Sequence, residues 1–487
     1  MILTHLKLPF LKTFSFTVLT PIILFWLSLY ALGYPLPGDD DLFFIGAGIN
    51  LAETGNFVNP FLAQWAEQTI DRFYVQPPFY SYALAPWLNI FGITTRSFLL
   101  FQFFCYSSFS TFLALTLRKL KFSPLASWAI IVCAGLWLLI GGLRQDAFAT
   151  ALLMAGLYYL LTDHLVYYLI GFTILGLSVL SSPVNIAYAT PLAWGILIRN
   201  FVRHKKDSSS MGQYITPRLL MLLSAIVIVF LLFLLSINFE LTRFFADLSW
   251  HSQLRRSPVS RMIPNLIFIV TVGYGEITYG LLYLFSLFLG ALLWVKHKTT
   301  PKSLFFIILS LILSIILGLI TYANTLGSNV NFVIWVIVIL TLDKLSIKAI
   351  HQRTLAVIAS VLVLINYSPA ILNLVFVDHS PDPPEKIAEI LDYVTNNPEK
   401  TYFIDGIAAR YIFDYNLPAE SVSWEFSGEP AMGPPTSLTE KAENAVWILS
   451  RRQAWHVAEL PDYPRLKLLG HRFKSIASQP HKILLIP

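Results

Sequence analysis

Long apolar segments follow one another along most of the chain and predict helices that span a membrane. The first covers 13–34 and is longer than the core of a cleavable signal peptide, so we expect a retained span. A signal peptide with Ala31-Leu32-Gly33 as its cleavage site is the alternative. Ten further segments are long enough to cross, some of them when tilted: 97–117, 125–142, 146–162, 164–182, 184–200, 217–237, 277–295, 302–322, 330–347 and 354–375. The pattern predicts eleven spans.

Lysine and arginine residues orient these spans. Four basic segments fall on the same side as the N-terminus, which the positive-inside rule assigns to the cytoplasm: 118–121, 199–206, 296–302 and 344–353. This orientation holds only if 77–93 does not cross. We therefore expect an interfacial or re-entrant helix that begins at Pro77-Pro78 and ends at Gly92. The segment 264–276 is also too short to span.

Two large polar parts lie on the opposite, extracytoplasmic side. One is the first outer loop, 35–95, and the other is the tail, 378–487, which begins with Pro-rich sequence at 380–384. The tail contains an amphipathic helix near 385–396 and strand-like segments at 401–405, 445–449 and 482–486. We expect a membrane domain over 1–377 and a small α/β domain over 378–487, which is long enough to fold alone.

Composition supports an α-helical polytopic membrane protein, and we expect it in the plasma (inner) membrane. Only 13% of the residues are charged, against about a quarter in soluble domains, and 56% are hydrophobic. These values exclude a soluble enzyme, a disordered chain and a nucleic-acid binder. The net charge of +6 is explained by the cytoplasmic loops. Cys105 and Cys133 lie inside apolar segments, so they offer neither a disulfide framework nor a thiolate metal site.

The first outer loop carries the densest chemical signal, the adjacent carboxylates Asp39, Asp40 and Asp41. Such crowding is typical of sites that handle a proton or a cation. The alternative is a solvated acidic cap on a helix from about 42 to 53.

The residues that follow appear in a recognisable order. Asp40-Asp41-Leu42-Phe43-Phe44 precedes a helix rich in small residues, then Gly55-Asn56-Phe57-Val58-Asn59-Pro60, then Pro77-Pro78-Phe79-Tyr80. This order resembles the opening loop of the GT-C superfamily of polyprenyl-phosphate-sugar glycosyltransferases, in the branch of protein O-mannosyltransferases and aminoarabinose transferases. Asp40 falls on the family's catalytic Asp and Asp41 on its Glu, although a register one residue earlier stays open. Gln76 replaces the family's usual Lys, and the stretch between Pro60 and Pro77 is longer.

Other segments extend the resemblance over roughly the first 200 residues. Arg144-Gln145-Asp146 is similar to the family's Arg-x-Asp, which makes Asp146 a second acid of the site; a plain helix cap is the alternative. The segment 176–184 is similar to a further motif, with Ser182 at a position where Lys is common, and a plain helix end is the alternative. At 324–331 asparagines stand where relatives have Arg-Tyr.

The resemblance implies an inverting transfer of a sugar from a polyprenyl-phosphate donor to an extracytoplasmic glycan, lipid or protein. Asp40 would be the general base, and Asp41 and Asp146 would orient it or the acceptor. No Gly-rich nucleotide-binding loop appears in the sequence, and a lipid donor needs none. No cofactor is assigned, and a divalent metal ion stays an open alternative. A lipid or glycan flippase and a non-catalytic assembly factor are the competing functions.

Substrate-binding candidates come from three segments. The loop 238–263 carries Arg243, His251, Arg255, Arg256 and Arg261, and one hypothesis is that Arg255 or Arg256 reaches the donor phosphate. An ordinary solvated loop on anionic headgroups is the alternative. Arg144 or Arg72 would otherwise contact the phosphate. The remaining candidates are Gln76, Pro77, Pro78 and Tyr74; for Tyr74, as for Trp65 and Trp87, anchoring at the membrane interface is the alternative to stacking on a sugar.

Overall fold

The computed structural model describes the first half of the chain almost continuously and selected parts of the tail. The described residues are 15–35, 41–61, 69–120, 122–140, 142–162, 164–186, 189–190, 193, 196–197, 200, 211–255, 384–400, 402–404, 413–414, 422–423, 446–450 and 482–486. They are mostly helical. Asp40, Trp65, Arg256 and the segments 277–295, 302–322, 330–347 and 354–375 lie outside the described residues, so the predicted number of spans stays a prediction.

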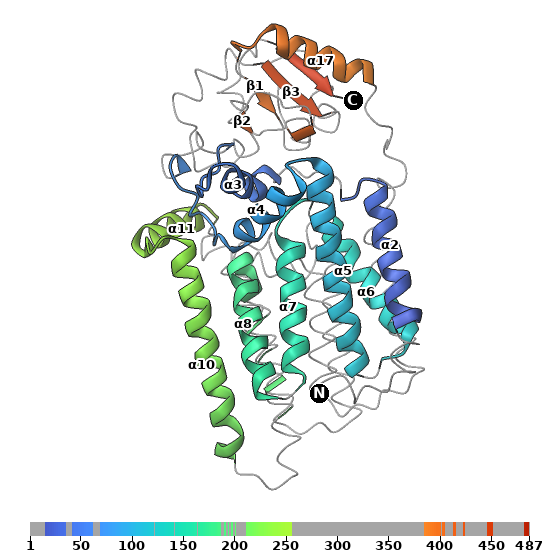
Figure 1. The fold of residues 1–487 in the computed structure, drawn as a ribbon, viewed down its shortest axis with the longest axis vertical. Helices are drawn as coiled ribbons and strands as arrows, with labels where there is room; N and C mark the ends of the chain where they lie inside the picture. The colour runs from blue at the N-terminus through green and yellow to red at the C-terminus, as the bar shows by residue number, and fades with distance from the viewer. Residues whose placement is uncertain are drawn as a thin grey trace, which may run out of the picture.

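Six long helices lie side by side: α2 (Thr20–Ala31), α5 (Thr95–Lys119), α6 (Pro124–Ile140), α7 (Asp146–Leu160), α8 (Leu165–Ser181) and α10 (Met211–Ser236) (Figure 1). The π-helical turn η1 (Ser15–Leu19) precedes α2, and the 3-10 turn η3 (Pro183–Asn185) follows α8. Each long helix falls on a segment predicted from its apolar residues. Within the described residues, Thr95–Lys119 and Gln213–Ser236 are long and apolar enough to cross a membrane.

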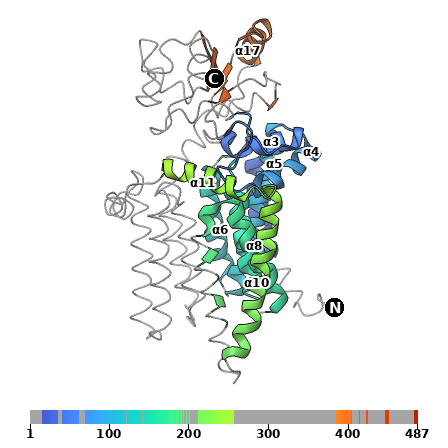
Figure 2. The same ribbon diagram turned by 90° about the vertical axis from the view of Figure 1, so that its left-hand side faces the viewer.

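Three further helices gather at one end of these six, which we call the α3 end: α3 (Asp41–Thr54), α4 (Phe79–Phe91) and α11 (Leu241–Arg255) (Figure 2). Helix α4 has the predicted bounds, because Pro78 precedes it and Gly92 ends it with φ of +81°. Helix α11 was not predicted, and its sequence was read as a loop. Its residues are too polar for a span, yet Arg243, Asp247 and His251 recur at a spacing of four and share one helix face.

Helices α7 and α8 approach each other closely through two glycines. A Cβ atom on Gly156 would lie 2.9 Å from the carbonyl oxygen of Gly171, and a Cβ on Gly171 would lie 2.9 Å from that of Gly156. A second link follows, because the buried Ser178 hydroxyl on α8 donates to the Ala149 carbonyl of α7 at 2.7 Å. Small residues that permit backbone contact are typical of helix pairs packed in lipid.

In the tail, helix α17 (Pro384–Asn396) precedes a four-stranded parallel sheet with the strand order β2-β1-β3-β4. Strands β1 (Tyr402–Ile404), β3 (Val446–Ser450) and β4 (Lys482–Ile486) match predicted segments, whereas the two-residue β2 (Val422–Ser423) was not foreseen. The register pairs Phe403 with Trp447 and Trp447 with Ile483. That the whole tail forms an independent α/β domain stays a prediction.

Candidate functional site

A short loop between α6 and α7 is held in place by side chains from three other helices. It opens at Gly142, whose φ of +61° favours glycine. The Leu143 N–H donates to Asp41 Oδ1 of α3 at 2.9 Å, and the Leu143 carbonyl accepts from the Tyr80 hydroxyl of α4 at 3.0 Å. The Arg144 carbonyl accepts from the Gln102 side-chain amide of α5 at 3.1 Å. The loop is therefore fixed in position at the α3 end.

Asp41 is buried at the first turn of α3, with 1% of its surface exposed. The N–H of Leu143 supplies one of its oxygens with a hydrogen bond of 2.9 Å. A solvated acidic cap, the alternative drawn from the sequence, is therefore wrong for Asp41. Its neighbour Asp40 lies outside the described residues.

Arg144 and Asp146 form an ion pair beside Asp41. The Arg144 Nε atom lies 3.0 Å from Asp146 Oδ2, and the two side chains are 29% and 26% exposed. The Arg144 guanidinium also lies 4.5 Å from the ring centre of Phe44 on α3. Both charged groups are thus held in place and still reached by solvent, as a ligand-binding pair must be.

The phenol of Tyr80 interacts electrostatically with both acids. Burial raises the pKa of its phenol well above the ordinary value, and electrostatic interactions with Cys105, Asp41 and Asp146 raise it further. Tyr80 belongs to one of the sequence motifs but was not a predicted site residue, and Gln102 was not predicted either. The signal for Gln102 was present, because it is the single side-chain amide in the apolar helix α5.

The motif residue Asn59 braces the first turns of α3. It is fully buried and donates through Nδ2 to the carbonyls of Leu42 and Phe43, at 2.9 and 3.3 Å. Its Oδ1 atom accepts from the N–H of Phe61 at 3.2 Å. A Cβ atom on Gly46 would lie 2.3 Å from that Oδ1, so any larger residue there would displace the Asn59 side chain from its hydrogen bonds. The spacing of the motif therefore has a physical cause: its later residues hold the helix that begins at Asp41.

The segment 74–78 contributes buried candidates. Tyr74, Gln76, Pro77 and Pro78 are all buried. The Tyr74 hydroxyl donates to the Ile237 carbonyl at the end of α10, at 3.0 Å, and burial raises the Tyr74 pKa to about 12. In this arrangement Tyr74 joins the first loop to α10, and its hydroxyl is already engaged.

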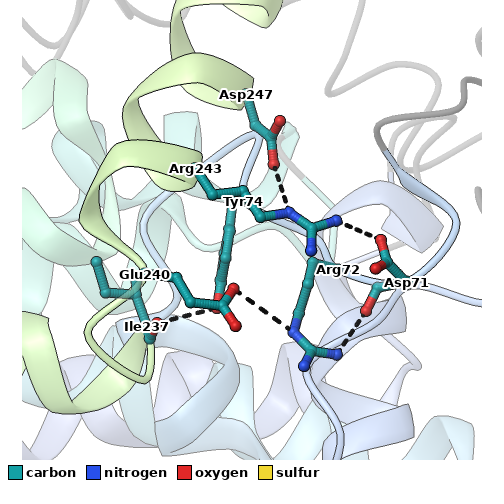
Figure 3. A network of polar contacts seen from close by, with 7 residues as sticks. All are labelled: Asp71, Arg72, Tyr74, Ile237, Glu240, Arg243 and Asp247. Carbon is teal, nitrogen blue, oxygen red and sulfur yellow. Dashed lines mark hydrogen bonds and ion pairs between the residues drawn. The ribbon is translucent and has the colours of Figure 1, made fainter.

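Charged residues also connect the first outer loop to the segment that joins α10 and α11 and to the first turns of α11 (Figure 3). Arg72 Nε lies 3.8 Å from Glu240 Oε2, and Arg243 of α11 pairs with Asp71 and, at 3.8 Å, with Asp247. The Arg243 guanidinium lowers the pKa of Asp71, chiefly through their hydrogen bond. Burial raises the pKa of Asp247. This network fixes the start of α11 against the loop, and it already engages Arg72.

The Asp71–Arg243 pair is expected to contribute only slightly to stability, because the Asp71 side chain is 61% exposed. A double-mutant cycle of Asp71→Asn and Arg243→Gln should give a coupling free energy of about 0.2–1 kcal/mol at pH 7. The pair lowers the Asp71 pKa in the folded state, so its contribution is present above the unfolded pKa and is lost as pH falls through the folded value. The coupling free energy is measured from unfolding of the four proteins of the cycle in detergent at pH 7 and at about pH 3. A larger coupling at the lower pH would contradict an ion pair as its source.

Helix α11 continues from this network towards the start of α3. The His251 ring stacks on Phe43 with the ring centres 5.7 Å apart, and Phe43 contacts Phe44 edge-on at 5.0 Å. Arg255 is the last residue of α11, and neither its side chain nor Arg256 belongs to the described residues. The path of α11 thus leads past the α3 residues next to Asp41.

The structure therefore brings Asp41, Arg144 and Asp146 together, while Arg72 and Tyr74 lie in the neighbouring network. Within the described residues, no group of three or more His, Cys, Asp or Glu side chains could hold a metal ion. No protein-family model, curated protein or solved structure matches the chain.

Proposed function

We propose that this chain is a membrane glycosyltransferase that moves a sugar from a polyprenyl-phosphate donor to an extracytoplasmic acceptor, with inversion. The main support is the meeting of Asp41 with the Arg144–Asp146 pair, because Asp41 and Leu143 are 102 positions apart in sequence. Two motifs selected for their chemistry thus meet at one end of the apolar helices. Lipid-linked sugars present their phosphate and anomeric carbon at that depth, where apolar helix surface ends.

In the proposed reaction, an acceptor hydroxyl attacks the anomeric carbon of the sugar. The bond from that carbon to the phosphate oxygen breaks, polyprenyl phosphate leaves, and the hydroxyl proton passes to a carboxylate. We assign the general base to Asp40, and the orientation of base or acceptor to Asp41 and Asp146. Arg144 is 29% exposed and offers a charged, planar donor to the departing phosphate; Arg255 or Arg256 would supply another.

A membrane setting is supported by the surface of α10. Most of its large apolar side chains are exposed, including Leu223 at 57% and Leu235 at 59%. Exposed apolar surface of this length suits contact with lipid tails. Under the proposal the α3 end faces the extracytoplasmic side, at the depth of the headgroups.

The proposed topology places the tail outside the cytoplasm. Protease added to sealed right-side-out vesicles should remove an epitope placed after Pro487, because we expect an odd number of spans after a cytoplasmic start. An epitope inserted at Ser208, in a basic loop, should stay protected. The opposite pattern of digestion would refute both the topology and the assignment of the site.

Transfer itself is tested with the full chain in proteoliposomes. The probes are polyprenyl-phosphate monosaccharides with radiolabelled sugars, and a cell-envelope fraction supplies acceptors. We expect label in the acceptor, free polyprenyl phosphate, and inverted anomeric configuration in the product. Movement of intact donor across the bilayer without cleavage would instead establish a flippase, and neither cleavage nor movement would favour an assembly factor.

A further inference from the structure

A two-residue segment of the tail, the buried Phe413 and the exposed Asp414, contacts the α3 end. Phe413 is only 8% exposed, although it lies far along the chain from the residues it contacts. Its ring centre lies 5.1 Å from that of Phe98 in the first turns of α5, and 6.4 Å from that of Phe61, which it meets edge-on. Phe61 and Phe98 are themselves buried. Phe413 therefore completes an aromatic cluster that the helical part leaves open.

The next residue, Asp414, caps α5. Its Oδ1 atom accepts a hydrogen bond of 2.9 Å from the N–H of Thr95, the first residue of that helix. The first amides of a helix have no acceptor within the helix, and their partial positive charge favours a carboxylate. Thr94 supplies the ordinary local cap, since its hydroxyl accepts from the Ser97 N–H at 3.2 Å. Helix α5 therefore has two caps, one local and one from the tail.

We propose that Phe413 and Asp414 form a docking element that fixes the tail on the first turns of α5 at the α3 end. Both views place α17 and the strands beyond α3 and α4, on the side of the long helices where the site lies (Figures 1 and 2). The chain's own tail covers Phe61 and Phe98, because Phe413 is buried against them. The carboxylate of Asp414 is also complementary to the positive end of the α5 dipole.

The docking element also reaches the site through α5. Phe98 and Gln102 are four residues apart and lie on one face of the helix, and Gln102 holds the carbonyl of Arg144. The tail contacts the first turns of α5 through Phe413 and Asp414, and α5 in turn positions the Arg144 loop through Gln102. The docking does not depend on the chemistry proposed above.

Hydrogen exchange at single amides of the full chain in detergent micelles tests the docking. In Asp414→Ala, exchange at the Thr95 amide should become faster by roughly tenfold or more, because Asp414 is its acceptor. The Ser97 amide should keep its rate. In Thr94→Ala, exchange should become faster at the Ser97 amide and stay unchanged at the Thr95 amide. Asp392→Ala, at an exposed position of α17, is the matched control and should change neither.

Two further variants separate docking from misfolding. Asp414→Asn keeps an acceptor oxygen without the charge, so the rate at Thr95 should lie between those of wild type and Asp414→Ala. Phe413→Ala should also speed exchange at Thr95, because Asp414 loses its anchor. Unchanged exchange at Thr95 in Asp414→Ala, or an even increase over all α5 amides in both Asp414 variants, would overturn the proposal. The exchange experiment uses no substrate. A negative result in it therefore does not bear on the proposed sugar transfer, and a negative transfer assay does not bear on the docking.

Discussion

Sugar transfer by an Asp40→Asn protein is expected to fall about a hundredfold or more, because the amide keeps the shape of the side chain and removes its capacity to accept a proton. The measurement is turnover in proteoliposomes at saturating donor. Glu53→Gln is the matched control, because Glu53 is an exposed carboxylate at the far end of α3. It should keep wild-type turnover. Full activity in a correctly inserted Asp40→Asn protein would show that another group is the base.

Variants of Asp41 complete this experiment by separating charge from position. Asp41→Asn retains an oxygen that can accept from Leu143, whereas Asp41→Ala leaves that buried N–H without its acceptor. Leaving a buried amide unsatisfied costs about 1–3 kcal/mol, so Asp41→Ala should lose stability as well as activity. Asp41→Asn should lose activity with a smaller loss of stability. Equal unfolding free energies for the two variants would contradict the positioning role.

The largest expected loss of stability comes from Gly156→Leu. A side chain at this position meets the Gly171 carbonyl oxygen of α8 at 2.9 Å, and a backbone atom cannot move aside as a flexible side chain can. Forcing α7 and α8 apart should lower the free energy of unfolding by about 3 kcal/mol. Unfolding in detergent measures this, with Gly156→Ala expected to give a smaller loss.

A small-to-large change elsewhere provides the comparison. Ser108→Leu adds a similar volume at an exposed position of α5 and should cost little. Similar losses in Gly156→Leu and Ser108→Leu would show that the close approach of α7 and α8 is not what the glycine serves.

Helix positions were predictable because the sequence marks them locally. Apolar length identified α5 and α10, and Pro78 and Gly92 bound α4 where expected. Helix α11 was missed because polar and charged residues interrupt its apolar ones, so no continuous apolar segment marks it, and its packing depends on pairs with distant residues such as Asp71. Strand β2 has two residues, too few for any period to show.

The sequence identified three charged residues that meet at the α3 end, but not the contacts that join them. Asp41, Arg144 and Asp146 were identified from motifs, yet nothing in the sequence indicated that the Leu143 peptide group joins two of the motifs. Phe413 and Asp414 were beyond reach, because no local pattern specifies a contact with residues more than three hundred positions away. A residue such as Leu143 that bonds through its backbone N–H and carbonyl cannot be recognised from its side chain, because nearly every residue type carries these groups.

The two caps on α5 act at different times in the life of the chain. Asp414 and Thr95 are 319 positions apart, and at about 5–20 residues per second a ribosome needs roughly 15 to 60 s to make the intervening sequence. During that interval the nascent helix has only the cap from Thr94. The local cap therefore serves the helix while the chain is being synthesised, and the tail's carboxylate completes it once the sequence up to Asp414 has been made.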